Sequence, residues 1–486
     1  MSTLASRSVS RSAILSSSEA LIVWRHPIPQ PPPVKGQPGF VASDPTEGPE
    51  PLVVVWRDGS VTALCGHVDL GTGLRTALTQ IVAEELDVPM TAVHLIMGST
   101  QAAPNQGATI ASASIQIHAE PLRRAAAQAR SLLVQQLATR WACLASDLQL
   151  SDGVFSHGTR QAEVGAAVPE GGLKVELDLA TPVKPAHLYR LVGQSVPRVD
   201  IPAKANGESA FVHDIRWPGV LHGRVIRPPY AGADHGDFIG HTLDSVEQAS
   251  IGHIPGVRAV VVQGDFVGVV ADREEHAELA MLQLQVRWKP WPRMPDVSDL
   301  EQALRANPST PRELIDEGDV EAALQNAQPA MERTYVWPYQ MHASLGPSCA
   351  LAHWLDGADA EQPQIRLRVW AATQNPHVLR RDLAVLMDLR DTEVDVVRME
   401  GAGCYGRNGA DDVAADAALM SRATGAPVRV QLTREQENAW EPKGAAQWMH
   451  VRGGLGPNGQ PMGYDFETAY PSNGRSEEHT SELQSH

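Results

Sequence analysis

The chain has 486 residues, of which 43% are hydrophobic and 20% are charged, so it holds enough apolar material for about three globular domains. Its 40 basic and 57 acidic residues give a net charge of −17. This excludes a general affinity for nucleic acid, because such affinity comes from cations that neutralise phosphates. The apolar runs fall short of the roughly 18–20 residues that a membrane-spanning helix needs.

The four cysteines, Cys65, Cys143, Cys349 and Cys404, stand far apart. They form no C-x-x-C pair, so the sequence predicts no structural zinc site, redox dithiol or iron–sulfur cluster in this chain. The 18 histidines include no H-E-x-x-H motif, and we predict no direct metal ligand. A redox cofactor would therefore be held by backbone and hydroxyl groups, and an electron relay would lie in another chain.

Both ends of the chain differ from its middle. Residues 1–39 are rich in serine and then in proline, and we expect a flexible segment there. Arg7 and Arg11 leave open a degenerate twin-arginine export leader. Residues 475–486 are polar and aperiodic and resemble the translation of a sequencing adapter, so we exclude them from the fold and expect a C-terminally truncated protein.

The first folded region, residues 40–185, is expected to mix strands and helices. The Asp58-Gly59 pair between two β-rich stretches predicts a hairpin over 52–64. The apolar spacing then predicts a helix that Pro89 ends, and Pro121 is expected to open a long alanine-rich helix.

The remaining regions continue the alternation of strands and helices, which gives an α+β (mixed α/β) fold class. Between them, residues 292–330 are charged and punctuated by proline, and are expected to be a connector with one or two short helices. The predicted strands are 93–97, 220–226, 257–262, 266–270, 331–337, 365–370, 394–399 and 428–432, and the predicted helices include 277–284, 379–387 and 416–421.

Three segments place glycine or small residues beside hydroxyl or amide groups at strand–helix junctions. They are DLGTGLRTALTQ (69–80), PNQGATIASASIQ (104–116) and TQNP (373–376) with the later GAGCYGRNGADD (401–412). Glycine lets the backbone approach a ligand, and a helix N-terminus offers free N–H groups. Each segment also has a plain structural interpretation: a turn, a small-residue packing interface, or a structural glycine run.

In this order, the three segments resemble the molybdenum-cofactor-binding large subunits of the xanthine dehydrogenase/aldehyde oxidase family. The stretch VPRVDIPAKANGESAFVHDIRWPGVLHGRVIRPP (196–229) is similar to the start of that family's a/b hammerhead domain. Because the GxG-type loop precedes the hammerhead here, the order resembles the isoquinoline 1-oxidoreductase and nicotinate dehydrogenase type of large subunit. PYQMHASLGPSCA (338–350) and GAGCYGRNGADD favour the nicotinate dehydrogenase type.

The resemblance implies molybdopterin-binding segments on either side of a hammerhead domain. The expected division is a flexible segment 1–39, a molybdopterin-binding segment 40–185, a hammerhead domain 186–291, a connector 292–330, the first part of the main molybdopterin-binding domain 331–474, and the adapter-like tail 475–486.

The resemblance also implies which residues contact the cofactor, a molybdenum–molybdopterin that is expected in its cytosine dinucleotide form. Thr72 stands where relatives usually have glutamine, and Cys404 resembles an insertion. Asn408 and Gly409 occupy the place of a carboxylate found in purine-oxidising relatives, so purine substrates are not expected. The implied cofactor-binding residues are Leu70, Gly71, Thr72, Ala111, Ser112, Ala113, Ser114, Gln374, Gly403, Tyr405, Gly406 and Arg407.

The function implied is oxidative hydroxylation of an N-heteroaromatic, nicotinate-like substrate, with water as the oxygen source. The family's catalytic base, a glutamate, is expected beyond this sequence, so no catalytic residue is named here and these residues alone are expected to be inactive. Expected partners are a 2Fe–2S small subunit and, as one candidate acceptor, a cytochrome c. We expect a soluble protein, with a cytoplasmic location favoured over a periplasmic one. The alternatives are an aldehyde-oxidising member of the family and a non-catalytic scaffold that has lost the cofactor.

Overall fold

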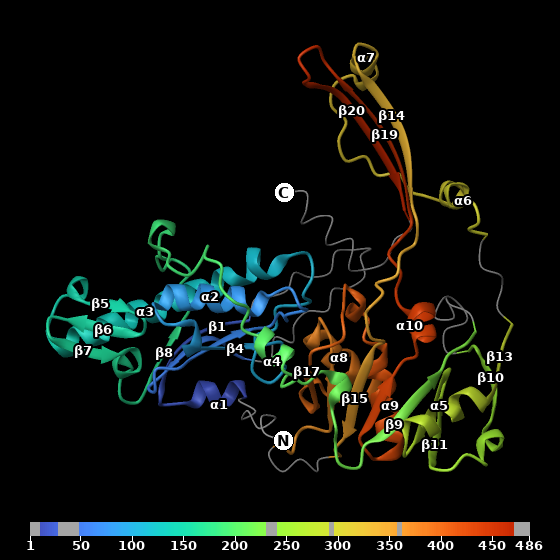
Figure 1. Cartoon of the computed structure of the whole chain (residues 1–486), viewed down its shortest axis with the longest axis horizontal. Helices are drawn as coiled ribbons and strands as arrows, with labels where there is room; N and C mark the ends of the chain where they lie inside the picture. Colours follow the sequence, from blue (N-terminus) through green and yellow to red (C-terminus); the bar gives the residue numbers. More distant parts are fainter. Residues whose placement is uncertain (1–9, 28–47, 230–240, 291–295, 357–361, 471–486) are drawn as a thin grey trace.

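Figure 1 shows the computed structural model of the chain, which describes residues 10–27, 48–229, 241–290, 296–356 and 362–470. The adapter-like tail 475–486 and residues 28–39 of the expected flexible segment lie outside the described residues. The described part mixes helices and strands, which confirms the predicted fold class.

The first body is a five-stranded sheet in the order β4-β3-β2-β1-β8. Its central strands are apolar on both faces because both faces are covered: α2 and α3 bury one face, and α1 with the segment around Ala102 buries the other. A small hairpin sheet, β5-β6-β7, extends this body beyond α3. The elements are α1 Arg11–Ser16, β1 Ala20–Arg25, β2 Glu50–Trp56, β3 Val61–Cys65, α2 Leu74–Leu86, β4 Val93–Met97, α3 Ala119–Trp141, β5 Gln149–Ser151, β6 Val154–His157, β7 Arg160–Glu163 and β8 Leu173–Glu176.

The prediction of a flexible segment over residues 1–39 is wrong for its middle part. Strand β1 pairs with β2 and β8, and Ala20 to Val23 are completely buried. Arg11 in α1 donates to the carbonyl of Ala103 at 2.7 Å. The five apolar residues of β1, Ala20 to Trp24, are enough for an interior strand of the sheet.

The long helix begins earlier than Pro121 predicts. Helix α3 starts at Ala119 and is preceded by a π-helical turn, Ser114–His118. The π turn runs directly into α3, so Pro121 lies inside continuous helix, where its missing N–H leaves a carbonyl of the preceding turn without that donor. Such π turns are frequent at functional sites, and this one overlaps the end of the second candidate segment.

The second body is a seven-stranded mixed sheet in the order β11-β12-β9-β18-β15-β16-β17. It joins strands from the predicted segments 186–291 and 331–474, whose boundaries remain predictions. Helices α8 and α9 cover one face with a core of valine, alanine and leucine. The elements are α4 Ile201–Ala205, β9 Leu221–Ile226, β10 Leu243–Glu247, β11 Val257–Gln263, β12 Phe266–Ala271, α5 Glu274–Gln283, β13 Gln285–Trp288, β15 Cys349–Trp354, β16 Leu367–Ala371, α8 Pro376–Met387, β17 Val394–Arg398, α9 Asp412–Thr424 and β18 Val428–Gln431.

Strands β16 and β17 are parallel neighbours, and this pairing positions the candidate site. Parallel strands end at the same edge of a sheet, where ligands of open α/β sheets bind. The chain leaves β16 towards Gln374 and leaves β17 towards the glycine run 401–406, so these two segments emerge side by side.

A three-stranded sheet, β14-β19-β20, projects from the second body as a long arm (Figure 1). The two predicted connector helices, α6 and α7, pack on one face of this arm, through contacts such as Leu304 with Trp448. The other face exposes Met331, Tyr335 and Phe466. The elements are α6 Leu300–Ala306, α7 Val320–Gln325, β14 Ala330–Trp337, α10 Arg434–Trp440, β19 Gln447–Leu455 and β20 Pro461–Ala469.

Among the helices of the described residues, none is both long and apolar enough to cross a bilayer.

Candidate functional site

The first candidate segment is a tight loop between β3 and α2 that a buried aspartate organises. The Asp69 carboxylate accepts hydrogen bonds from the backbone N–H groups of Gly71 (2.8 Å), Gly73 (3.3 Å) and Arg75 (2.9 Å). Gly71 has a φ of +96°, and a Cβ built on it would meet no atom within 4 Å. The loop is therefore rigid and leaves open space over Gly71 for a ligand.

The second candidate segment, 104–116, packs against the end of β3. A Cβ built on Gly66 would lie 2.1 Å from the Pro104 carbonyl oxygen, so only glycine permits this contact. Ala111 and Ser112 both have φ values near +55° (54° and 56°), a conformation that non-glycine residues rarely adopt and that concentrates at functional sites. Ala113 is buried, Ser112 is exposed, and Ser114 bonds to His67 at 2.7 Å.

Gln374 connects the second and third segments. Its backbone carbonyl accepts from Thr109 N–H at 2.9 Å, and its side-chain Nε2 donates to Thr109 O at 3.2 Å. Its Oε1 accepts from the thiol of Cys404 at 3.1 Å. Gln374 is 5% exposed, so its amide is held in one orientation.

The glycine run 401–406 lies over a second backbone segment. Gly403 and Gly406 have φ values of +101° and +99°, and Cβ atoms built on them would meet Leu345 N at 3.0 Å and the His342 ring at 3.1 Å. The run therefore needs glycine at both positions. Tyr405 between them has a φ of +55° and a side chain that is 68% exposed.

Arg407 points away from this loop into the protein. Its side chain is completely buried and donates to Glu437 (2.6 Å), Asp412 (2.9 Å) and the Ala410 carbonyl (2.6 Å). Burial alone lowers the pKa of Arg407, but the two carboxylates bring it above the usual value. The guanidinium thus anchors the loop, and it is not placed to contact a cofactor.

A pocket of about 260 Å³ lies where the first and third segments meet. Of the predicted site residues, it brings together Leu70, Gly71, Gly403 and Tyr405. Cys404 and Gly401 also line it. The predicted residues outside its lining are Thr72, Ala111, Ser112, Ala113, Ser114, Gln374, Gly406 and Arg407. Gln374 nevertheless touches the lining through Cys404.

Charged residues that the sequence reasoning missed surround this pocket. Arg398, at the end of β17, donates to Glu400 at 2.8 Å and to the Asp69 carbonyl at 2.5 Å, and within the described part of the chain its Nε has no hydrogen-bond partner. Lys204 bonds to Asp200 at 2.7 Å and lies 3.4 Å from Glu400. Arg198 donates to the Gly71 carbonyl at 2.7 Å. The sequence held one indication of these charged groups: Arg398 lies near the end of the predicted strand 394–399, and Arg198 and Lys204 lie in the stretch 196–206.

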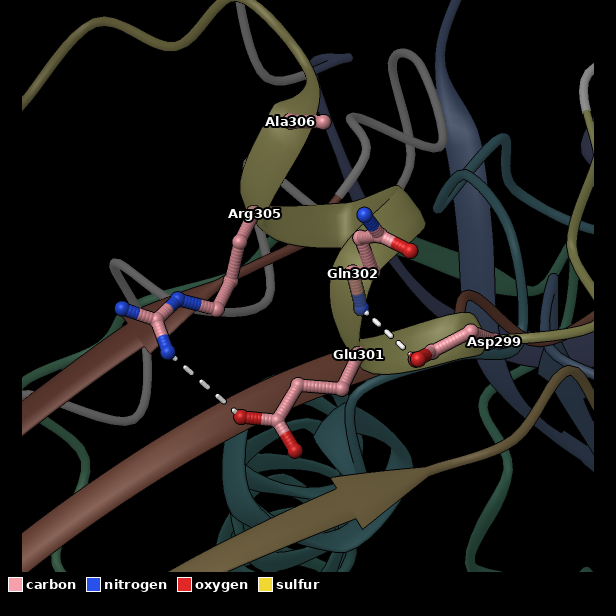
Figure 2. Close-up of a pocket in the computed structure, with 5 residues that line it drawn as sticks. All are labelled: Asp299, Glu301, Gln302, Arg305 and Ala306. Atoms are coloured by element: carbon pink, nitrogen blue, oxygen red, sulfur yellow. Dashed lines mark hydrogen bonds and ion pairs between the residues drawn. The ribbon is translucent and has the colours of Figure 1, made fainter.

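A larger hollow of about 410 Å³ lies on α6, away from these loops (Figure 2). Its polar groups are already paired within the helix. Asp299 accepts a hydrogen bond from Gln302 N–H at 3.0 Å, and Glu301 forms an ion pair with Arg305 at 3.5 Å. Ordinary capping and an (i, i+4) ion pair explain these residues, and we assign no site to them.

Two carboxyl groups, in and just after the third segment, have raised pKa values. Burial, the largest cause, raises the pKa of Asp411 to about 7, against a hydrogen bond from Thr373. Burial also raises the pKa of Asp416 to about 6. Neither carboxyl lines the pocket, so neither is placed as a base. Within the part of the chain that is described, no group of three or more His, Cys, Asp or Glu side chains could hold a metal ion.

Two family models match the chain, both described as molybdopterin cofactor-binding domain, over residues 34–182 and 306–484. The chain is 55% identical to the B subunit of nicotinate dehydrogenase from Pseudomonas putida over 428 residues, which is 87% of this chain and 35% of that protein. It is 28% identical to the beta subunit of isoquinoline 1-oxidoreductase from Brevundimonas diminuta, over 80% of this chain and 54% of that protein.

Among solved structures, aldehyde oxidoreductase from Desulfovibrio gigas aligns over 57% of this chain and 34% of its own, with 18% identity and a TM-score of 0.45. The chain spans about a third to a half of the length of the curated relatives named above. The two domain matches, which together cover more than half of the chain, show that the chain belongs to the xanthine dehydrogenase family of molybdopterin cofactor-binding proteins.

Proposed function

We propose that this chain forms the cofactor-binding part of a molybdenum hydroxylase that oxidises an N-heteroaromatic, nicotinate-like substrate. The observation that carries this proposal is the meeting of the loop after β3 and the glycine run after β17 in one pocket, with the amide of Gln374 held behind them. The substrate class rests on the 55% identity to the nicotinate dehydrogenase relative.

The residues present fit a pterin cofactor held without charged ligands. The space over Gly71 is open, whereas Gly403 and Gly406 let the third segment pack closely against Leu345 and His342, which a Cβ would prevent. Gln374 uses one of its two amide N–H groups on Thr109, which leaves the other for a ligand oxygen. Because no cluster of metal-ligating side chains is found in the described residues, the pterin would carry the metal.

When bound, a molybdenum–molybdopterin supplies the two-electron chemistry of hydroxylation with water as the oxygen source. The chain's own residues position the ligands and exclude bulk water. The Gly71 and Gly403 backbone would bind the cofactor, Gln374 would donate an amide hydrogen bond, and the exposed Tyr405 ring would form one wall for a planar substrate. Phe211 on the pocket lining offers a second aromatic surface.

The charge around the pocket suits a substrate that carries a carboxylate. The Arg398 side chain is 7% exposed and lines the pocket, and its Nε–H has no hydrogen-bond partner among the described residues. Lys204 is a second cation on the same lining, and Glu400 between them balances part of their charge. An anionic ring substituent could approach these cations, whereas a neutral aldehyde would gain nothing from them.

The finer assignments belong to the same proposal. They are the cytosine dinucleotide form of the cofactor, a 2Fe–2S small subunit as the electron acceptor, a cytochrome c beyond it, and a soluble protein with a cytoplasmic location favoured over a periplasmic one. Of these, the separate 2Fe–2S subunit is supported by the lack of any C-x-x-C pair or cysteine cluster in this sequence and by relatives whose printed names describe them as subunits. The 12 proposed cofactor-contact residues from Leu70 to Arg407 stay a proposal. For Arg407, which is completely buried and whose N–H donates to the Cys404 carbonyl, the role would be to hold the loop in place.

A panel of substrates tests this function against its alternatives. The protein with its small subunit is assayed for dye reduction with pyridine carboxylates, unsubstituted pyridine-type rings and aromatic aldehydes. Turnover of the pyridine carboxylates above the others supports the proposal, and preference for aldehydes supports the second candidate. The absence of both turnover and molybdenum would favour a non-catalytic scaffold.

A further inference from the structure

A buried histidine that is not among the proposed cofactor contacts lies directly behind Ser114. His67 is 1% exposed and follows Gly66, whose close approach to Pro104 fixes the backbone there. The His67 Nδ1 atom lies 2.7 Å from Ser114 Oγ, and its Nε2 atom lies 3.2 Å from the backbone carbonyl oxygen of Gln106. Both ring nitrogens are therefore engaged by residues of the second candidate segment.

These two contacts determine where the imidazole proton lies. A backbone carbonyl oxygen can only accept, so Nε2 must carry the proton and donate to Gln106. In a neutral ring, Nδ1 then has a lone pair and no proton. The Ser114 hydroxyl must therefore donate its proton to Nδ1, because Nδ1 carries no proton that it could donate.

The surroundings of His67 keep the ring neutral. Burial lowers the pKa of His67 to about 4. The ring of His118 lies 4.1 Å away, and burial lowers the pKa of that group to about 3, with Arg25 contributing in the same direction. Glu50, the nearby carboxylate, is paired with Arg25 at 2.9 Å. The π-helical turn Ser114–His118 brings both of its end residues against His67.

We propose that His67 fixes Ser114 as a hydrogen-bond acceptor, so that Ser114 recognises an N–H donor of the bound ligand, such as the amino group of a pterin. The hydroxyl proton is committed to His67, and the two oxygen lone pairs remain for a ligand. A phosphate oxygen, which only accepts, gains nothing from a hydroxyl in this state. This inference rests on the proposed function and makes His67 a positioning residue for the pterin.

Ser112 provides an internal comparison. It belongs to the same small-residue loop, but it is exposed and has a φ of +56°. Its hydroxyl has no histidine behind it among the described contacts, so it can rotate to donate or to accept. A comparison of the single variants Ser112→Ala and Ser114→Ala therefore distinguishes the loss of a rotatable hydroxyl from the loss of a hydroxyl fixed as an acceptor.

Two measurements on the whole chain test the inference. The first is the ¹⁵N NMR spectrum of histidine-labelled protein, with His67 assigned by its loss in His67→Asn. We expect a neutral ring protonated at Nε2 near pH 7, and the same ring when Ser114 is replaced by alanine. A ring protonated at Nδ1, or an imidazolium at pH 7, would overturn the inference without any cofactor being present.

The second measurement is the affinity for 2-amino-4-oxopteridine, with inorganic phosphate as a comparison probe. Loss of one hydrogen bond predicts that Ser114→Ala weakens pteridine binding about fivefold. His67→Asn, which places an amide oxygen near the position of Nδ1, should stay within about twofold. His67→Gln, whose amide reaches only the Nε2 position, should resemble Ser114→Ala. Phosphate affinity should not follow this pattern.

The outcomes distinguish the inference from the function on which it rests. Pteridine binding that is indifferent to Ser114→Ala and to His67→Gln contradicts the acceptor role and leaves the proposed function intact. Binding of the pteridine by none of the proteins, with the His67 tautomer as expected, contradicts cofactor binding itself, and the ligand role of Ser114 falls with it.

Discussion

The thiol of Cys404 donates a hydrogen bond to Oε1 of Gln374 across 3.1 Å, and both side chains are buried, at 5% exposed each. Cys404 resembles an insertion in the glycine loop, yet it orients the one amide that two candidate segments share. The backbone carbonyl of Cys404 also accepts from Ser344 Oγ and Arg407 N–H. The extra residue is therefore integrated into the site by three hydrogen bonds.

Replacement of Cys404 by alanine should release the Gln374 amide. A buried carbonyl oxygen that loses its donor costs about 1 kcal/mol of unfolding free energy, and the amide becomes free to flip. Cys404→Ser keeps a donor and should retain both stability and molybdenum. Denaturant unfolding and metal analysis measure the two effects, with Cys143→Ala, a partly exposed cysteine on another element, as the control. Equal behaviour of the alanine and serine variants would contradict this role.

Gly71 and Gly193 offer a matched pair for testing the pocket. Both have left-handed φ values, +96° and +87°, and a Cβ built on either meets nothing within 4 Å. Alanine at either position should destabilise the fold by about 1–2 kcal/mol through backbone strain alone. Only Gly71→Ala should lower the molybdenum content, since its Cβ would occupy the space proposed for the cofactor. A parallel loss of molybdenum in Gly193→Ala would show that strain, and not the pocket, is responsible.

The Arg407–Glu437 ion pair should be among the most sensitive contacts of the second body. Both side chains are completely buried at an N···O distance of 2.6 Å, and Glu437 also accepts from Ser348 N–H and Oγ. Glu437→Gln leaves a buried guanidinium short of charge, which predicts a loss of about 3 kcal/mol in unfolding free energy. Glu120→Gln, in a half-exposed pair with Arg124, should change it by no more than about 0.5 kcal/mol. A similar loss for both variants would argue against the anchoring role.

Asp411 should make the protein less stable as the pH rises. Its folded pKa of about 7 lies above the ordinary value of 3.8, so between these values the folded state holds a proton that the unfolded state has released. By linkage, the free energy of unfolding then falls as the pH increases through this window. Asp411→Asn removes that contribution, and its unfolding free energy should decline less between pH 5 and pH 8 than in the unmodified protein. Asp152→Asn, with a side chain 74% exposed, should leave the pH dependence unchanged.

Much of the fold follows from local patterns in the sequence. The hairpin at Asp58-Gly59, the strand 93–97 and the alanine-rich helix lie where apolar spacing and turn residues predict them, and the stretch 292–330 contains two short helices where one or two were expected. Strand β1 was missed because an interior strand covered on both faces has no polar–apolar alternation, and its five apolar residues lie in a serine- and proline-rich context.

The sequence predicted which segments form the candidate site, but it did not predict the hydrogen bonds and charged groups within that site. The glycine loops were recognisable because their residue types permit close approach of the backbone. The roles of His67 and Arg398 depend on partners far away in sequence, 39 positions for His67 with the Gln106 carbonyl and 329 for Arg398 with the Asp69 carbonyl. No local pattern contains such partners. Arg407 is a residue that the motif suggested as a cofactor contact, but its side chain points into the protein and donates to Glu437.

The central claim is that the loops carrying Gly71, Gly403 and Gln374 hold one pterin cofactor. The most direct measurement is the molybdenum and pterin content of the protein purified from its native cells. The claim predicts close to one of each per polypeptide, both released together on denaturation. A well-folded protein that contains neither would contradict it.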